Sequence, residues 1–137
     1  MPLLDNDKTI TSLLRSARTI AVVGLSDKPY RDSNVIARYL LDNGYTVYPV
    51  NPAFTSVLGL RSFPDLASIG TAIDIVDVFR RPAFVPAVVR DAISAGMQTV
   101  WFQLGVSHPD TTADALRHGL QVIEERCIMV EHRRLIL

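Results

Sequence analysis

The feature that most constrains the fold of this 137-residue chain is an early strand, turn, helix and second strand. Residues 19–23 are apolar without polar alternation, which is typical of a strand covered on both faces in a parallel sheet. Gly24 ends this segment. A polar stretch then leads to a helix that Ser33 or Asn34 can cap, and residues 45–50 form the second strand. A parallel strand pair joined by a helix is therefore expected.

The rest of the chain repeats this alternation and predicts an α/β fold. A first helix, capped by Asp5 or Asp7, precedes the first strand, and residues 53–63 are irregular. The later segments are a helical turn at 64–68, a strand at 73–79, a helix at 82–95, a strand at 99–103, a helix from Pro109 to Gly119 and a strand at 120–123. We expect a doubly wound, five-stranded parallel sheet with helices on both faces and strand order 3-2-1-4-5.

Composition narrows the class of protein. The length fits one domain, residues 1–137. Lys plus Arg equals Asp plus Glu at 14 each, so no global field favours nucleic acid or an anionic membrane surface. The single cysteine, Cys127, has no internal disulfide partner, and no segment resembles a signal peptide or a membrane span. We therefore predict a cytoplasmic protein.

The end of the second strand bears on the ligand. In nicotinamide-binding units, an acidic residue about 20 positions beyond the glycine motif binds the ribose hydroxyls. Here the strand ends in Asn51-Pro52, where Asn51 is neutral and Pro52 has no N–H. The first turn also lacks a complete G-x-G-x-x-G motif. The sequence predicts a nucleotide crevice, and NAD is not its first candidate.

Ligands of doubly wound sheets bind outside the carboxyl ends of the strands. Gly24 allows a ligand to approach the backbone, Ser26 and exposed N–H groups can donate to phosphate oxygens, and Lys28, Arg31 and Arg80 can neutralise phosphate. The predicted binding residues are Gly24, Leu25, Ser26, Lys28, Arg31, Ser33, Asn34, Val50, Asn51, Pro52, Phe79, Arg80, Gln103 and Gly105. No catalytic residue is assigned among them.

Several separated motifs resemble the small, stand-alone CoA-binding domain proteins, which are related to the nucleotide-binding domain of succinyl-CoA synthetase. The motifs are Ala21-Val-Val-Gly-Leu-Ser26, Gly44-Tyr45, Pro49-Val-Asn-Pro52, Asp74-Ile-Val-Asp-Val-Phe-Arg-Arg-Pro82, Val100-Trp-Phe-Gln-Leu-Gly105, and Arg126-Cys127 through Glu131-His132. The resemblance covers residues 20 to about 135. It implies a Rossmann-like fold that holds coenzyme A, or an acyl-CoA, with the diphosphate at residues 24–26 and the adenosine near 50–52 and 79–80. It also implies binding without a catalytic domain.

The sequence is also compatible with other functions. Gly24 also fits a simple tight turn, Phe79 also fits the core, and Arg81 fits a solvated position. The three histidines are scattered, so no metal site is predicted. Cys127 is either a half-buried structural residue or a thiolate that exchanges with the thiol of CoA. The alternatives to a binding module are an NAD(P)-linked oxidoreductase, Cys127-based CoA-thiol chemistry, and an interaction protein with a vestigial site. A homodimer or another protein partner also remains open.

Overall fold

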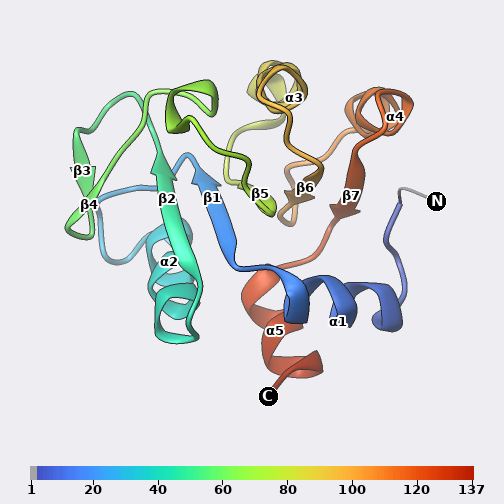
Figure 1. Cartoon of the computed structure of the whole chain (residues 1–137), viewed down its shortest axis with the longest axis horizontal. Helices are drawn as coiled ribbons and strands as arrows, with labels where there is room; N and C mark the ends of the chain where they lie inside the picture. Colours follow the sequence, from blue (N-terminus) through green and yellow to red (C-terminus); the bar gives the residue numbers. More distant parts are fainter. Residues whose placement is uncertain (1–2) are drawn as a thin grey trace.

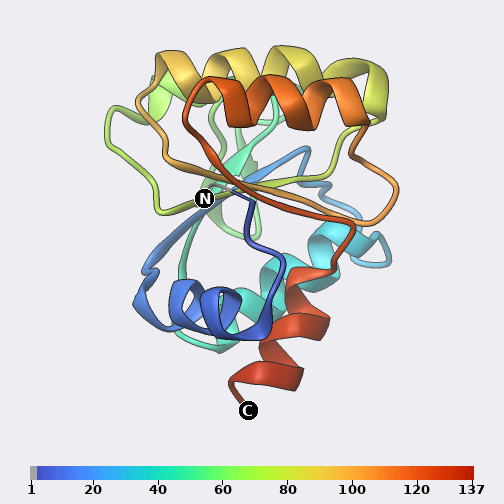
Figure 2. The same cartoon turned by 90° about the vertical axis from the view of Figure 1, so that its right-hand side faces the viewer.

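The computed structural model of the chain describes residues 3–137 and shows a five-stranded parallel sheet between two layers of helices (Figures 1 and 2). Helices α1, α2 and α5 cover one face, and α3 and α4 cover the other. The strands are β1 (Thr19–Val23), β2 (Thr46–Val50), β5 (Ile75–Val78), β6 (Thr99–Phe102) and β7 (Gln121–Glu124). The helices are α1 (Asp7–Ser16), α2 (Asp32–Asp42), α3 (Val85–Ser94), α4 (Pro109–Arg117) and α5 (Ile128–Leu135). The predicted Rossmann-like α/β class is confirmed.

The order of the strands differs from the predicted one. The sheet runs β2-β1-β5-β6-β7, which is 2-1-3-4-5 when the parallel strands are numbered along the chain, and not 3-2-1-4-5. Pro49 lies in β2 and has no N–H for a second neighbour, so β2 suits an edge. Every residue of β5 is buried, as a central strand requires. The Asp74 carboxylate accepts hydrogen bonds from the N–H groups of Arg18 (2.7 Å) and Thr19 (3.1 Å), which holds β5 beside β1.

Several local predictions need correction. Asn6, and not Asp5 or Asp7, caps α1 by accepting a hydrogen bond from Thr9. Helix α2 begins after Arg31 without a side-chain cap. The predicted caps, Ser33 and Asn34, lie inside the helix and bind the N–H and the carbonyl of Ser26. The sequence also did not predict the hairpin of β3 (Ser56–Val57) and β4 (Leu60–Arg61), nor helix α5. Short 3-10 helices occupy Ala67–Ile69 (η1) and Pro82–Phe84 (η2).

Apolar side chains fill both layers between the sheet and the helices. Trp101 is fully buried, and its indole N–H donates to the Arg126 carbonyl (2.9 Å). Asp77 is also fully buried, and neither of its carboxyl oxygens has a partner within residues 3–137. Burial raises the pKa of Asp77, so the neutral acid is the favoured form there. The hydrogen bond from the Arg18 N–H is the main cause of the lowered pKa of Asp74.

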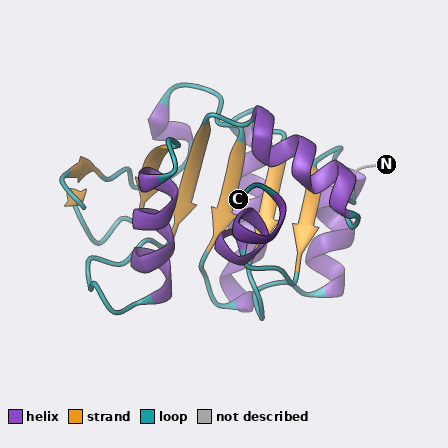
Figure 3. Ribbon diagram, turned by 90° about the horizontal axis from the view of Figure 1, so that it is seen from below, coloured by secondary structure: helices purple, strands orange, loops and turns teal. Residues whose placement is uncertain are grey.

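All five parallel strands point the same way and end at one level (Figure 3). The last paired residues are in register across the sheet: Val50 with Val23, Val23 with Val78, Val78 with Phe102 and Phe102 with Glu124. The first residues beyond this level are Asn51, Gly24, Phe79, Gln103 and Glu125. Predicted binding residues from four strands therefore share one edge of the sheet. None of the helices within residues 3–137 has the length and apolar character needed to cross a membrane.

Candidate nucleotide-binding site

Gly24 follows β1, the strand between β2 and β5, and is required by the fold itself. Its φ angle is +86°, and a Cβ atom placed there would lie 2.1 Å from the Phe79 carbonyl oxygen and 3.2 Å from Cδ of Arg80. The Gly24 N–H donates to the Val50 carbonyl (2.8 Å), and the Phe79 N–H donates to the Val23 carbonyl (2.8 Å). The tight-turn interpretation is therefore correct. Because Gly24 has no side chain, only backbone separates two hollows at this turn.

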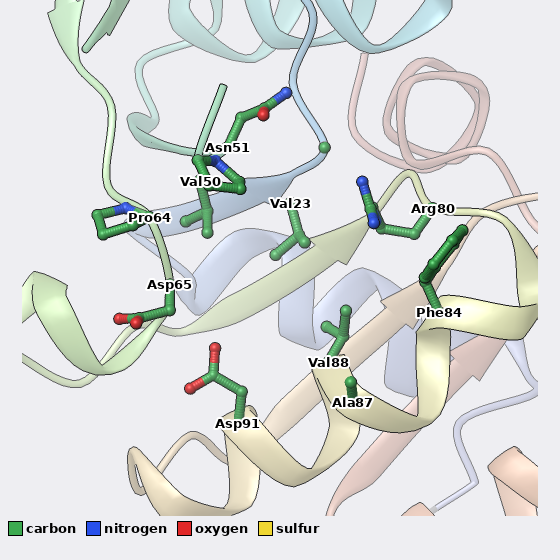
Figure 4. Close-up of a pocket in the computed structure, with 12 residues that line it drawn as sticks. Val23, Val50, Asn51, Pro64, Asp65, Arg80, Phe84, Ala87, Val88 and Asp91 are labelled. Atoms are coloured by element: carbon green, nitrogen blue, oxygen red, sulfur yellow. The ribbon is translucent and has the colours of Figure 1, made fainter. Parts of the chain in front are cut away.

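The first hollow, here called the α3-side hollow, lies between the ends of β1 and β2 and helix α3, with a volume of about 220 Å³ (Figure 4). Its walls are mainly apolar. The Arg80 side chain lies beside the Gly24 turn, and its Cζ is 4.7 Å from the centre of the Phe84 ring. Its lining residues are Val23, Gly24, Val50, Asn51, Pro52, Pro64, Asp65, Arg80, Phe84, Ala87, Val88 and Asp91. An apolar hollow with a few polar groups suits a planar heterocycle.

The second, or α2-side, hollow lies across the Gly24 turn and is more polar, with a volume of about 360 Å³. Its lining residues are Gly24, Ser26, Tyr30, Arg31, Asp32, Ser33 and Phe79. Ser33 Oγ accepts from the Ser26 N–H (3.0 Å), Ser26 Oγ accepts from the Lys28 N–H (3.1 Å), and the Asn34 amide donates to the Ser26 carbonyl (2.8 Å). The Ser26 N–H is thus already used, whereas the Ser26 hydroxyl proton is available to a ligand.

The Asn51 side chain, which follows β2, is used in holding the fold. Its Nδ2 donates to the Leu25 carbonyl (3.0 Å), and its Oδ1 accepts from the Ala53 N–H (3.0 Å). The side chain therefore ties the end of β2 to the end of β1. It places no ionised acceptor at this position for a ribose.

The predicted residues fall into four groups. Val50, Asn51, Pro52 and Arg80 line the α3-side hollow, Ser26, Arg31, Ser33 and Phe79 line the α2-side hollow, and Gly24 lines both. The residues that line neither hollow are Leu25, Lys28, Asn34, Gln103 and Gly105.

The positions of the five residues that line neither hollow are as follows in the structure. Leu25 is fully buried, and Lys28 is exposed on the loop before α2. Asn34 is buried and holds that loop in place. Gln103 accepts from the Ile128 N–H (3.2 Å) at the start of α5, and Gly105 adopts a positive φ in the loop after β6.

The helical half of the α3-side hollow was missed in the sequence. Phe84, Ala87, Val88 and Asp91 recur at intervals of three and four residues, which places them on one face of a helix. This spacing indicates a helix face, but the predicted binding residues include only the strand ends and the segment from Ser26 to Asn34. Asp65 follows a turn-forming proline and has no comparable signal in the sequence.

Cys127 and His132 lie outside both hollows. Cys127 is the half-buried residue immediately before α5, and it forms no side-chain capping bond. His132 is buried in α5, where Nδ1 lies 2.7 Å from the Tyr39 hydroxyl, and burial lowers the pKa of His132. Within residues 3–137, no three His, Cys, Asp or Glu side chains are grouped so that they could hold a metal ion.

Comparisons with known proteins agree with this architecture. A family model described as a CoA binding domain matches residues 18–133. YneT of Bacillus subtilis is 36% identical over 123 residues, which cover 90% of this chain and 91% of YneT. The structure of a hypothetical protein from Pyrococcus horikoshii OT3 has a TM-score of 0.94 and 39% identity, with 97% of this chain and 94% of that chain covered. Acetate–CoA ligase (ADP-forming) I of Archaeoglobus fulgidus is 24% identical over 121 residues, which are 81% of this chain but 18% of the ligase.

Proposed function

The chain belongs to the CoA-binding domain family, and we propose that it binds coenzyme A or an acyl-CoA at the carboxyl edge of its sheet without transforming it. The observation that carries this proposal is the Gly24 turn, which separates an apolar hollow from a polar one. Coenzyme A has the same division, because a planar adenine is joined through a diphosphate to a polar pantetheine arm. A ligand lying across the turn would place each part against a surface of matching character.

In the proposed complex, the adenine enters the α3-side hollow and contacts Val23, Val50 and Val88. The diphosphate crosses the backbone at Gly24, within reach of the Arg80 guanidinium and the Ser26 hydroxyl. A guanidinium forms strong, charge-assisted hydrogen bonds with phosphate oxygens. The N-terminus of α2 adds partial positive charge beside the α2-side hollow. The pantetheine arm then leaves over the α2-side hollow.

The same geometry favours binding over catalysis. Neither hollow contains a histidine or a cysteine, and Ser26 has no general base among its hydrogen-bond partners. Asn51 uses both ends of its amide within the chain, which disfavours the ribose recognition of a nicotinamide enzyme. The ligase relative is an enzyme by name, but this chain matches a small part of it. The proposal takes from that relative the binding of CoA alone.

Ligand binding should be tested first on the freshly purified protein. Native mass spectrometry should find a mass increase equal to CoA or an acyl-CoA. After removal of any bound ligand, CoA should raise the melting temperature in a dose-dependent manner, because a ligand that binds only the native state stabilises it. Dephospho-CoA, ADP and NAD should give smaller shifts at equal concentration. A shift with NAD as large as that with CoA would contradict the proposal and restore the oxidoreductase.

A further inference from the structure

One carboxylate oxygen in the α3-side hollow has no role in holding the fold. Asp91 lies in α3, and its Oδ2 accepts a hydrogen bond from the Leu66 N–H (2.8 Å). Its Oδ1 receives no hydrogen bond from any residue between 3 and 137. The side chain is half-buried and extends from α3 toward the hollow (Figure 4). The Leu66 bond fixes the orientation of the carboxylate and leaves the second oxygen for a ligand.

Asp91 also lies at the opposite end of the hollow from the cation. Phe84, which packs against the Arg80 guanidinium, precedes Asp91 by seven residues, or about 10 Å along a helix. The hollow therefore has a cation near the Gly24 turn, apolar walls along its length and a hydrogen-bond acceptor at the far end. A nucleotide has the matching order: phosphate, then sugar, then the edge of the base. With phosphate near Arg80, the base edge would face Asp91.

We propose that Asp91 determines the specificity of the site for adenine, an inference that rests on the proposed function. Its Oδ1 accepts a hydrogen bond from the exocyclic amino group of the base. Hypoxanthine and guanine carry a carbonyl oxygen at that position, and a carboxylate beside a carbonyl oxygen is repulsive. Discrimination thus combines an attractive contact with the right base and a repulsive one with the wrong base.

The neighbouring carboxylate, Asp65, provides a matched control. It also lines the hollow, but its Oδ1 already accepts from the N–H and hydroxyl of Ser68, and the residue is exposed. Asp65→Asn removes the same charge at nearly the same place. Asp91→Asn is sharper, because the Leu66 N–H requires an acceptor and so directs the amide oxygen toward itself. The new NH2 group then faces the hollow and donates to a carbonyl oxygen.

The experiment is titration calorimetry of ligand-free protein with CoA, ADP and IDP. ADP and IDP differ in the amino or carbonyl group that Asp91 would contact. The wild type should bind ADP at least tenfold more tightly than IDP. Asp91→Asn should weaken CoA and ADP binding and remove or reverse the preference over IDP, whereas Asp65→Asn should keep it.

The outcomes separate this inference from the proposed function. Equal affinity of the wild type for ADP and IDP would overturn the role of Asp91, even with tight binding of CoA, and this comparison needs no variant to fold. A folded Asp91→Asn protein that still prefers ADP would overturn it as well. If ADP is preferred over IDP but CoA does not bind, the proposed function fails and the base specificity stands. If neither nucleotide nor CoA binds, both are overturned.

Discussion

The two hollows beside Gly24 are built in different ways. The α3-side hollow is walled by the ends of β1 and β2, by one face of α3 and by the loops that follow β2 and β5. The α2-side hollow is walled largely by the loop between β1 and α2. Side-chain hydrogen bonds hold that loop: Asn34 binds the Ser26 carbonyl, and Arg38 binds Asn34 Oδ1 (2.9 Å) and the Pro29 carbonyl (2.7 Å).

We expect the two hollows to contribute unequally to the affinity for the ligand. A preformed apolar cavity costs little to occupy, and burial of a flat base in it releases water from apolar surface. A polar loop offers donors, but each one exchanges a bond with water for a bond with the ligand, and the net gain is small. Most of the affinity should therefore come from the α3-side hollow, with phosphate and arm contacts adding to it.

The largest effect should follow from filling the α3-side hollow. Ala87 is exposed on α3 and lines the hollow, so Ala87→Trp should place an indole where the base would lie without disturbing the core. CoA should give no measurable heat of binding and no rise in melting temperature. Ala113→Trp, on the exposed surface of α4 and outside both hollows, is the matched control and should bind CoA normally. Normal binding by a folded Ala87→Trp protein would move the site away from this hollow.

The contacts around Gly24 also show why that glycine is a poor target for the same test. A side chain at Gly24 would meet the Phe79 carbonyl before it met any ligand. Loss of binding after Gly24→Val would therefore report damage to the turn as much as a blocked phosphate site. Ala87→Trp avoids this, because the added ring extends from the exposed face of a helix.

The sequence was sufficient for the half of the site that the strands contribute. Parallel strands end at one edge, so the residues that follow each strand were predictable as neighbours without knowledge of strand order. The predicted strand order was wrong. Pro49 lacks an N–H, which favours an edge strand, and this residue indicates the observed position of β2. The helical half depended on the rotation of α3 about its axis, which the packing of Val85, Val89 and Ala92 in the core determines. The Gln103 side chain accepts a hydrogen bond from the Ile128 N–H of α5, a helix that was not predicted, and so it lines neither hollow.

An intermediate effect is expected from the cation between the hollows. Arg80→Gln should weaken CoA binding by about tenfold or more, because a hydrogen bond to a charged group contributes about 1.5–3 kcal/mol. Arg81 is the adjacent, exposed arginine and lines neither hollow, so Arg81→Gln is matched in charge and position along the chain. Calorimetry at two salt concentrations should show a weaker salt dependence for Arg80→Gln alone. Equal losses in both variants would mean that general positive charge, and not a placed guanidinium, attracts the ligand.

The smallest effect is expected at Cys127, which lies outside both hollows before α5. Cys127→Ser should leave the affinity for CoA unchanged within error, because the thiol contacts neither the base hollow nor the phosphate turn. Iodoacetamide should alkylate the native wild type slowly, and bound CoA should barely change the rate. A reactive cysteine instead needs a thiolate that is accessible to the sulfur of the ligand. Rapid alkylation near neutral pH that CoA blocks, with a mixed disulfide between CoA and Cys127, would extend the site along the edge of the sheet to α5 and make thiol exchange its chemistry.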